Sequence, residues 1–378
     1  MQFSVFFISL YHQKKKITFN NIKKNNMNKE FLKLLLSTHT PNGFEKEGIF
    51  VFGEYLDSCT NYEFSDNINN YGVSVGNGDI NVMLSAHIDE IALRVQYIDD
   101  DGFIYFIMNG GVDQKVLLGS RVTILTRKNG LIGNFINGVI GKTPIHIEYY
   151  SENKDKVTKI TDMKIDCGFS SKEEAIASGI SIGNHIIING EYSELGMNRF
   201  SSRGCDDKVG VFIVAEVMKL LSKHTLNKIK VWGVCCTQEE TTASGAIASA
   251  QRIDPQYSID LDVTFATDDG YVEKKEWGDV KLGKGGCIVH SPDCNEDFVD
   301  LTKEVFQTNN IPFQEFSLDG CMTNTNPIKQ SSSDCKNVLL SIPLRNMHTQ
   351  VEVCDFRDLD SLIQGIYHTI LKIENPIN

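Results

Sequence analysis

Apolar residues recur along this chain at spacings that change from one region to the next. Residues 29–38 and 47–57 place apolar side chains every three or four positions, which is typical of amphipathic helices. Residues 80–87 form an almost continuous apolar run, as expected of a buried strand. The chain then changes character, and short alternating runs fill residues 90–195.

This middle region predicts a small β-barrel. Its runs alternate apolar and polar residues, and turns rich in glycine, aspartate and asparagine separate them. The runs lie at 92–98, 102–108, 121–126, 133–141 and 185–192. One helix is predicted at 170–179, because serine precedes glutamates that would occupy its first turn.

After Ser202, predicted helices and strands alternate. Helices are predicted at 207–224, 241–253, 296–309 and 358–373, and strands at 228–237, 260–266 and 337–344. Such alternation implies a largely parallel sheet covered by helices. We therefore predict an α/β fold in which one discontinuous domain, residues 28–90 and 198–378, receives a β-barrel domain inserted at 91–197.

Residues 1–27 are predicted to be a disordered extension outside this fold. Residues 1–29 contain no acid, and their short apolar run precedes the lysines instead of following them. No small-residue cleavage site follows either, so a secretory signal fits poorly. No stretch of the chain approaches the roughly 20 apolar residues of a membrane span.

The net charge and the cysteine content limit the possible functions and the cellular location of the protein. The net charge of −12 argues against a nucleic-acid-binding protein, since phosphate contacts require a basic surface. The ten cysteines include no CxxC pair, and Cys235 and Cys236 are adjacent. In a chain of 378 residues this pattern indicates reduced, buried thiols and therefore a cytoplasmic location.

Histidines and carboxylates follow or end several of the apolar runs. They are His87, Asp206, Glu239, Glu240, Asp262 and His348. Open α/β sheets bind ligands where their strands end, and mixed imidazole and carboxylate ligands suit divalent cations. Asp89, two residues after His87, is placed to accept the second ring N–H of that histidine. Each residue also has a structural alternative, such as helix capping for Asp206 and a helix-start position for the two glutamates.

The order His, Asp, Glu-Glu, Asp, His, together with its surroundings, resembles one family. The strings that carry the resemblance include AHIDEIALRV, GCDDKVG, TQEETTASGA, LDVTFATD, KLGKGG and IPLRNMHTQVEV. They are similar, in the same order, to those of the TET-type (tetrahedral) glutamyl/leucyl aminopeptidases, also called FrvX-like or endoglucanase-like. The resemblance extends over nearly the whole chain from Asn28 onward.

This resemblance implies a set of roles. Asp206 would bridge two metal ions, with His87 and Asp262 completing one site and Glu240 and His348 the other. Glu239 would be the general base for a hydroxide activated by both metals, and Asp89 would orient His87. The ions would be Zn²⁺, or else Co²⁺ or Mn²⁺. The inserted domain would be a PDZ-like barrel that helps to assemble a tetrahedral dodecamer, and the substrates would be peptides that lose their N-terminal residues.

Two other functions are weighed against this aminopeptidase. A glycoside hydrolase would need two carboxylates facing each other about 5–9 Å apart, and adjacent Glu239 and Glu240 do not obviously meet that requirement. A non-catalytic scaffold is the second alternative, because residues 318–334 depart from the family where the substrate pocket is formed. All the expected ligands and the base are present, which speaks against a scaffold.

Overall fold

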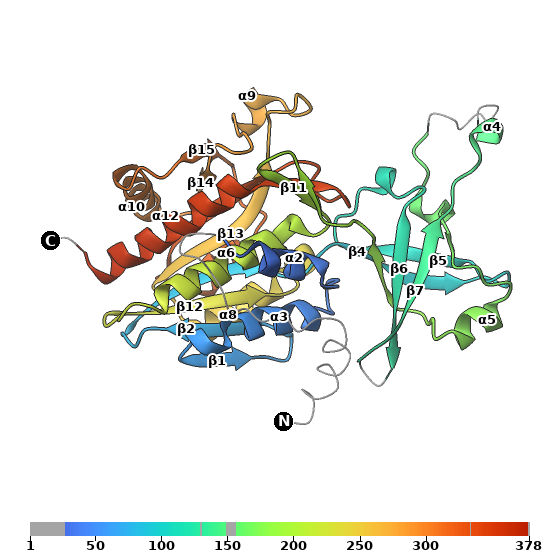
Figure 1. Cartoon of the computed structure of the whole chain (residues 1–378), viewed down its shortest axis with the longest axis horizontal. Coiled ribbons are helices and arrows are strands. Elements are labelled where there is room, and N and C mark those ends of the chain that lie inside the picture. Colours follow the sequence, from blue (N-terminus) through green and yellow to red (C-terminus); the bar gives the residue numbers. More distant parts are fainter. Residues whose placement is uncertain (1–26, 129–130, 149–155, 333, 377–378) are drawn as a thin grey trace.

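The structure, a computed structural model, describes residues 27–376 except 129–130, 149–155 and 333. The predicted extension therefore lies outside the described residues, apart from Met27. Figure 1 shows a large body of sheet and helices beside a smaller body built of strands. The α/β fold class with an inserted barrel is confirmed.

The large body is organised around an eight-stranded sheet. Its four central strands are neighbours and run parallel: β12 (Ile229–Cys236), β3 (Ile80–His87), β13 (Tyr257–Phe265) and β16 (Lys336–Leu344). On one side follow β2 (Tyr71–Val75) and β1 (Tyr62–Ser65), and on the other β14 (Gly286–His290) and β15 (Phe313–Ser317). Because the central strands are parallel, their carboxyl ends meet at one edge.

Helices cover both faces of this sheet. Successive residues of β3 point to opposite faces, so Val82 and Leu84 join the core beneath α6 (Cys205–Leu221), whereas Met83 joins the core beneath α8 (Ser244–Ile253). The α6 face also carries α2 (Lys29–Ser37), α3 (Lys46–Leu56), α10 (Glu296–Thr308) and α12 (Phe356–Glu374). The α8 face carries α11 (Thr325–Ser331). The large body thus has three layers, with the sheet between two layers of helices.

The smaller body is a closed six-stranded barrel with its own apolar core. Its strands are β4 (Ala92–Ile98), β5 (Ile104–Asn109), β8 (Ile165–Asp166), β7 (Leu131–Ile140), β6 (Arg121–Lys128) and β9 (His185–Ile188), in spatial order. The predicted helix is present as α5 (Lys172–Ala177), capped by the side chain of Ser171. A further short helix, α4 (Ile145–Glu148), lies in the connection from β7 to β8.

Several elements were not predicted. The helix predicted at 241–253 is two helices, α7 (Glu239–Thr242) and α8, because Ala243 between them has a left-handed φ of 51°. Strands β1, β2, β14 and β15 are additional, as is a three-stranded sheet of β10 (Ser193–Leu195), β11 (Arg199–Ser202) and β17 (Glu352–Asp355). The remaining short elements are η1 (Asp57–Cys59), η2 (Gln114–Val116), η3 (Ile160–Asp162) and α9 (Lys274–Trp277).

The structure also bears on the cysteines and on membrane insertion. All ten cysteines lie among the described residues, and none of them forms a disulfide. Within the described part of the chain, no helix combines the length and the apolar character that crossing a bilayer requires.

Candidate active site

Four of the central strands deliver the candidate residues to one edge of the sheet. His87 is the last residue of β3, and Asp262 lies three residues before the end of β13. Glu239 and Glu240 open α7, directly after β12, and His348 follows β16. Asp206 lies at the start of α6, which packs across β3 and β13. The structure thus brings all six candidates from five segments into one cluster.

His87, Asp206 and Asp262 form the first group of this cluster. The Nε2 atom of His87 lies 3.1 Å from Oδ1 of Asp206 and 4.0 Å from Oδ1 of Asp262. One ligand atom from each of the three residues lies within 4.8 Å of the others. All three residues are buried.

Asp206, Glu240 and His348 form the second group. The Nε2 atom of His348 lies 3.3 Å from Oδ2 of Asp206 and 3.7 Å from Oε2 of Glu240. Again, one ligand atom from each lies within 4.8 Å of the others. Asp206 belongs to both groups, and it turns one carboxylate oxygen toward each histidine.

Backbone carbonyls fix the orientation of both imidazole rings. Nδ1 of His87 lies 3.0 Å from the carbonyl oxygen of Asp89, and Nδ1 of His348 lies 2.7 Å from that of Gly111. A carbonyl can only accept, so each Nδ1 donates and each Nε2 faces the cluster. The Asp89 carboxylate is more distant, with Oδ1 3.6 Å from Nδ1 of His87. Gly111 belongs to the barrel region, which thus reaches the site.

The carboxylate of Asp89 instead holds the paired glutamates. It accepts hydrogen bonds from the backbone N–H groups of Glu239 and Glu240, both at 3.1 Å, and from the Asn42 amide at 2.8 Å. Gln238, just before α7, has a left-handed φ of 60°. Asp89 therefore fixes the sharp turn that directs both glutamate side chains toward the cluster.

Glu239 is the candidate that neither three-residue group includes. Its Oε2 atom lies 3.8 Å from Nε2 of His87, and 13% of its side chain is exposed. Burial raises the pKa of Glu239 to about 7, and the neighbouring Asp89 and Asp206 act in the same direction. A carboxyl group with a pKa near neutrality can exchange protons at neutral pH.

The electrostatics of the cluster favour a cation. Burial raises the pKa values of Glu240 and Asp262 well above their usual range. Burial alone would lower the pKa of His348, but Asp206 and Glu240 outweigh it and raise that pKa to about 10. The buried Oε1 atom of Glu240 has no hydrogen-bond partner within the described residues. An unpaired carboxylate oxygen among further acids and imidazoles fits divalent cations.

The capping alternative considered for Asp206 applies to its neighbour. Asp206 and Asp207 have non-helical backbone angles, and Asp207 accepts a hydrogen bond from the Gly210 N–H at 3.0 Å, so it caps the regular part of α6 that follows. The next residue, Lys208, is fully buried and donates to the carbonyl of Thr38 at 2.9 Å and to Glu90 at 3.0 Å. These contacts anchor the segment that carries Asp206 to the segment that follows His87.

Glu352 was missed as a site residue, although it stands four positions after His348. It is 1% exposed, and its two carboxylate oxygens accept from the backbone N–H of Asp206 at 3.2 Å and of His348 at 3.0 Å. One side chain on β17 therefore joins two segments of the cluster. The sequence did contain a signal that could have identified Glu352, because it is an acidic residue within the otherwise apolar string VEVC.

Comparisons with known proteins find relatives that match most of the chain. A family model described as M42 glutamyl aminopeptidase matches residues 69–364. The lysyl aminopeptidase of Pyrococcus furiosus is 30% identical over 341 residues, which is 89% of this chain and 94% of that protein.

Solved structures are similar over comparable lengths. An aminopeptidase from the archaeon Desulfurococcus kamchatkensis has a TM-score of 0.83 and 31% identity, covering 90% of this chain and 93% of that one. The Pyrococcus horikoshii TET1 peptidase, which can assemble into a tetrahedron or a large octahedral shell, has a TM-score of 0.80 and 29% identity. Its alignment covers 90% of this chain and 98% of that one.

Proposed function

The chain belongs to the M42 glutamyl aminopeptidase family, and from this premise we propose that it removes N-terminal residues from peptides with two divalent cations and Glu239 as general base. Family membership makes the chain a peptide hydrolase of a metallopeptidase family. It therefore favours peptide hydrolysis over the glycoside hydrolase and the scaffold. The two-cation chemistry, the ligand set and the base are our proposal.

One observation carries the proposal: two groups of candidate ligands share Asp206. His87, Asp206 and Asp262 would hold one cation, and Asp206, Glu240 and His348 the other. Two cations that share a carboxylate would lower the pKa of a water molecule and polarise the scissile carbonyl. The ligand types suit Zn²⁺, Co²⁺ or Mn²⁺.

Glu239 would then transfer the proton during the reaction. Glu239 is near the cluster without belonging to either ligand group, and its pKa of about 7 suits a group that accepts and returns a proton at neutral pH. In our proposal the Glu239 carboxylate takes a proton from the attacking water and delivers it to the departing amine. Asp89 holds the Glu239 backbone during both transfers.

We also propose that the chain is cytoplasmic and assembles into a homo-oligomer, with residues 91–197 as the assembly domain. The similarity to a TET1 peptidase that forms tetrahedra or octahedral shells supports an assembly, and the tetrahedral dodecamer is the form we expect. The ten free cysteines are compatible with a reducing compartment.

A panel of aminoacyl-arylamides tests the function. Metal-depleted protein should be inactive, and adding Zn²⁺, Co²⁺ or Mn²⁺ should restore cleavage of at least one member. Full activity in the presence of a strong chelator would overturn the metal-dependent mechanism. Failure of the metal-loaded protein to cleave any member would overturn the aminopeptidase.

A further inference from the structure

Asn42 lies between the barrel and the turn that carries the paired glutamates. It is 6% exposed. Its amide nitrogen donates to Oδ2 of Asp89 at 2.8 Å, and its amide oxygen accepts from Oγ1 of Thr241 at 3.2 Å. Asp89 accepts the backbone N–H groups of Glu239 and Glu240, and Thr241 belongs to the same helix, α7. Asn42 therefore holds α7 in two ways, through Asp89 and directly through Thr241.

The two contacts of this side chain call for an amide. The Asp89 carboxylate accepts hydrogen bonds and needs a donor, whereas the Thr241 hydroxyl donates here and needs an acceptor. The short side chain of asparagine supplies one of each. An aspartate at position 42 would have the same size, but it would lose the donor and place a second negative charge beside Asp89.

Side chains of the barrel hold the backbone of Asn42. Its carbonyl oxygen accepts from Nδ2 of Asn109 at 2.9 Å and from Nη2 of Arg94 at 3.5 Å. Arg94 lies on β4 and Asn109 ends β5, and these two strands pair in the barrel. The N–H of Asn42 donates to the carbonyl of Glu90, just before β4, at 3.3 Å. The position of Asn42 therefore depends on the position of these two barrel strands.

The two residues after Asn109 reach the second group of candidate ligands. The carbonyl of Gly111 accepts from Nδ1 of His348 at 2.7 Å. Gly110 has a left-handed φ of 95°, and a Cβ atom placed on it would lie 3.5 Å from Cβ of Glu240. The end of β5 thus contacts the cluster directly and also reaches α7 through Asn42.

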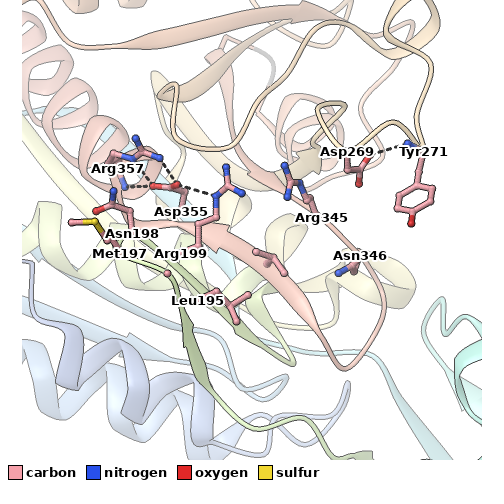
Figure 2. A pocket seen from close by; sticks show the side chains of 12 residues that line it. Leu195, Met197, Asn198, Arg199, Asp269, Tyr271, Arg345, Asn346, Asp355 and Arg357 are labelled. Atoms are coloured by element: carbon pink, nitrogen blue, oxygen red, sulfur yellow. Dashed lines mark hydrogen bonds and ion pairs between the residues drawn. The ribbon is translucent and has the colours of Figure 1, made fainter.

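A pocket of about 620 Å³ on the large body lies outside this network. Figure 2 shows Arg199, Asp355 and Arg357 on its wall, joined by hydrogen bonds and ion pairs. Arg199 and Asp355 are paired residues of β11 and β17, and successive residues of a strand point to opposite faces. They therefore occupy the face opposite to Glu352, which contacts the cluster. The pocket offers control positions that do not belong to the network.

We propose that the inserted barrel positions the general base, with Asn42 and Asn109 as positioning residues that connect β5 to the turn carrying Glu239. Neither asparagine touches the reacting atoms. They hold Asp89 and Thr241, and through them the start of α7. A misplacement of about 1 Å can cost about 10²-fold in rate, so a loosened turn would slow the chemical step. This inference rests on the proposed aminopeptidase function and gives the barrel a part in catalysis besides assembly.

Kinetics of Zn²⁺-saturated variants with the best-cleaved aminoacyl-arylamide test this role. Thr241→Val removes the hydroxyl at an exposed position and should lower kcat by about 3- to 10-fold, as expected for the loss of one neutral hydrogen bond. Thr241→Ser keeps the hydroxyl and should retain the wild-type kcat. Asn42→Asp loses the donor, and kcat should fall by about 10- to 100-fold. KM should stay within about twofold in all three, because none of these contacts is made to the substrate.

Asn109→Ala extends the test to the barrel. Its kcat should fall by about 3- to 10-fold. The double variant with Thr241→Val should lose less than the product of the two single losses, because both residues act through Asn42. Asn198→Ala is the control and should keep the wild-type kcat, since Asn198 is exposed and lines the pocket of Figure 2. Each kcat is expressed per metal-loaded chain, so that a variant that only folds poorly does not count as slow.

Several outcomes would overturn the positioning role and leave the aminopeptidase standing. They are an unchanged kcat in both Thr241→Val and Asn109→Ala, an equal loss in Thr241→Ser and Thr241→Val, and losses that simply multiply in the double variant. A lower melting temperature with an unchanged kcat per metal-loaded chain would also overturn it, because the asparagines would then only support the fold. Metal-loaded wild-type protein that cleaves no arylamide would overturn the aminopeptidase and this inference together.

Discussion

At the scale of single residues, the cluster depends on how Asp206 divides its two oxygens. Oδ1 faces His87 and Oδ2 faces His348. Without a cation, the cluster relieves its negative charge by keeping protons on the imidazoles and on buried carboxyl groups. Protons and cations therefore compete for the same oxygen and nitrogen atoms.

This competition makes cation binding depend on pH. Asp206 and Glu240 raise the pKa of His348 to about 10, so its ring carries a proton at neutral pH until a cation displaces it. We expect Zn²⁺ binding near neutral pH to release at least one proton per chain, and the affinity to fall from about pH 8 to about pH 6. Calorimetric titration in buffers of different ionisation enthalpy measures the release. A pH-independent affinity with no release would contradict the expectation.

Substituting Glu239 separates the base from the ligands. Glu239→Gln keeps the size of the side chain but cannot accept a proton, so kcat should fall by about 10²- to 10⁴-fold. The bound metal per chain should not change, because neither ligand group contains Glu239. Elemental analysis and arylamide kinetics on the same sample measure both quantities. Retained turnover would assign the base to another residue, and lost metal would make Glu239 a ligand.

At the scale of elements, β17 holds the cluster together through Glu352. Its carboxylate accepts N–H groups from two segments that lie far apart in the sequence. His348 also has a left-handed φ of 60°, which a residue other than glycine adopts only when its surroundings enforce it. Glu352 and the carbonyl of Gly111 provide that constraint.

Removing Glu352 should therefore loosen the site without removing a proposed ligand. In Glu352→Ala both N–H groups lose their partner, and we expect the metal affinity to fall by about 10- to 100-fold. Glu304→Ala, on the exposed face of α10, is the matched control and should bind metal like the wild type. Competition with a chromophoric chelator gives both affinities. Equal metal affinities of Glu352→Ala and the wild type would show that Glu352 does not support the metal site.

The sequence predicted those elements whose pattern is local. The apolar run at 80–87 and the alternation at 92–98 match β3 and β4 residue for residue, because most of the residues that each strand buries are apolar. The clustering of the candidate residues could be predicted as well, because all of them except Asp206 stand at or near strand ends. Glu352 and Gly111 escaped prediction because their role depends on contacts across the fold. The break at Ala243 escaped because alanine normally favours helix.

At the scale of the whole molecule, the barrel contributes to the site and also presents apolar surface. Gly111 follows β5 and contacts His348, so the inserted region supports a proposed ligand. At the far end of the barrel, Ile145 and Ile147 on α4 are 70% and 65% exposed. Exposed apolar side chains on one short helix are candidates for an interface between proteins.

We expect this part of the barrel to contribute to assembly. The double substitution Ile145→Asp and Ile147→Asp should reduce the mass of the particle in solution, because burying two carboxylates in an interface is unfavourable. Ile176→Asp, on α5 of the same barrel, is the control and should leave the mass unchanged. Light scattering after size-exclusion chromatography measures the mass. An unchanged mass in the double variant would place the interface elsewhere.

The number of divalent ions that each chain binds tests the central claim most directly. Metal-depleted wild-type protein titrated with Zn²⁺ should bind two ions per chain, and Asp206→Asn should weaken the binding of both because one carboxylate serves both groups. A wild-type chain that binds no ion and still cleaves aminoacyl-arylamides at full rate would contradict the account.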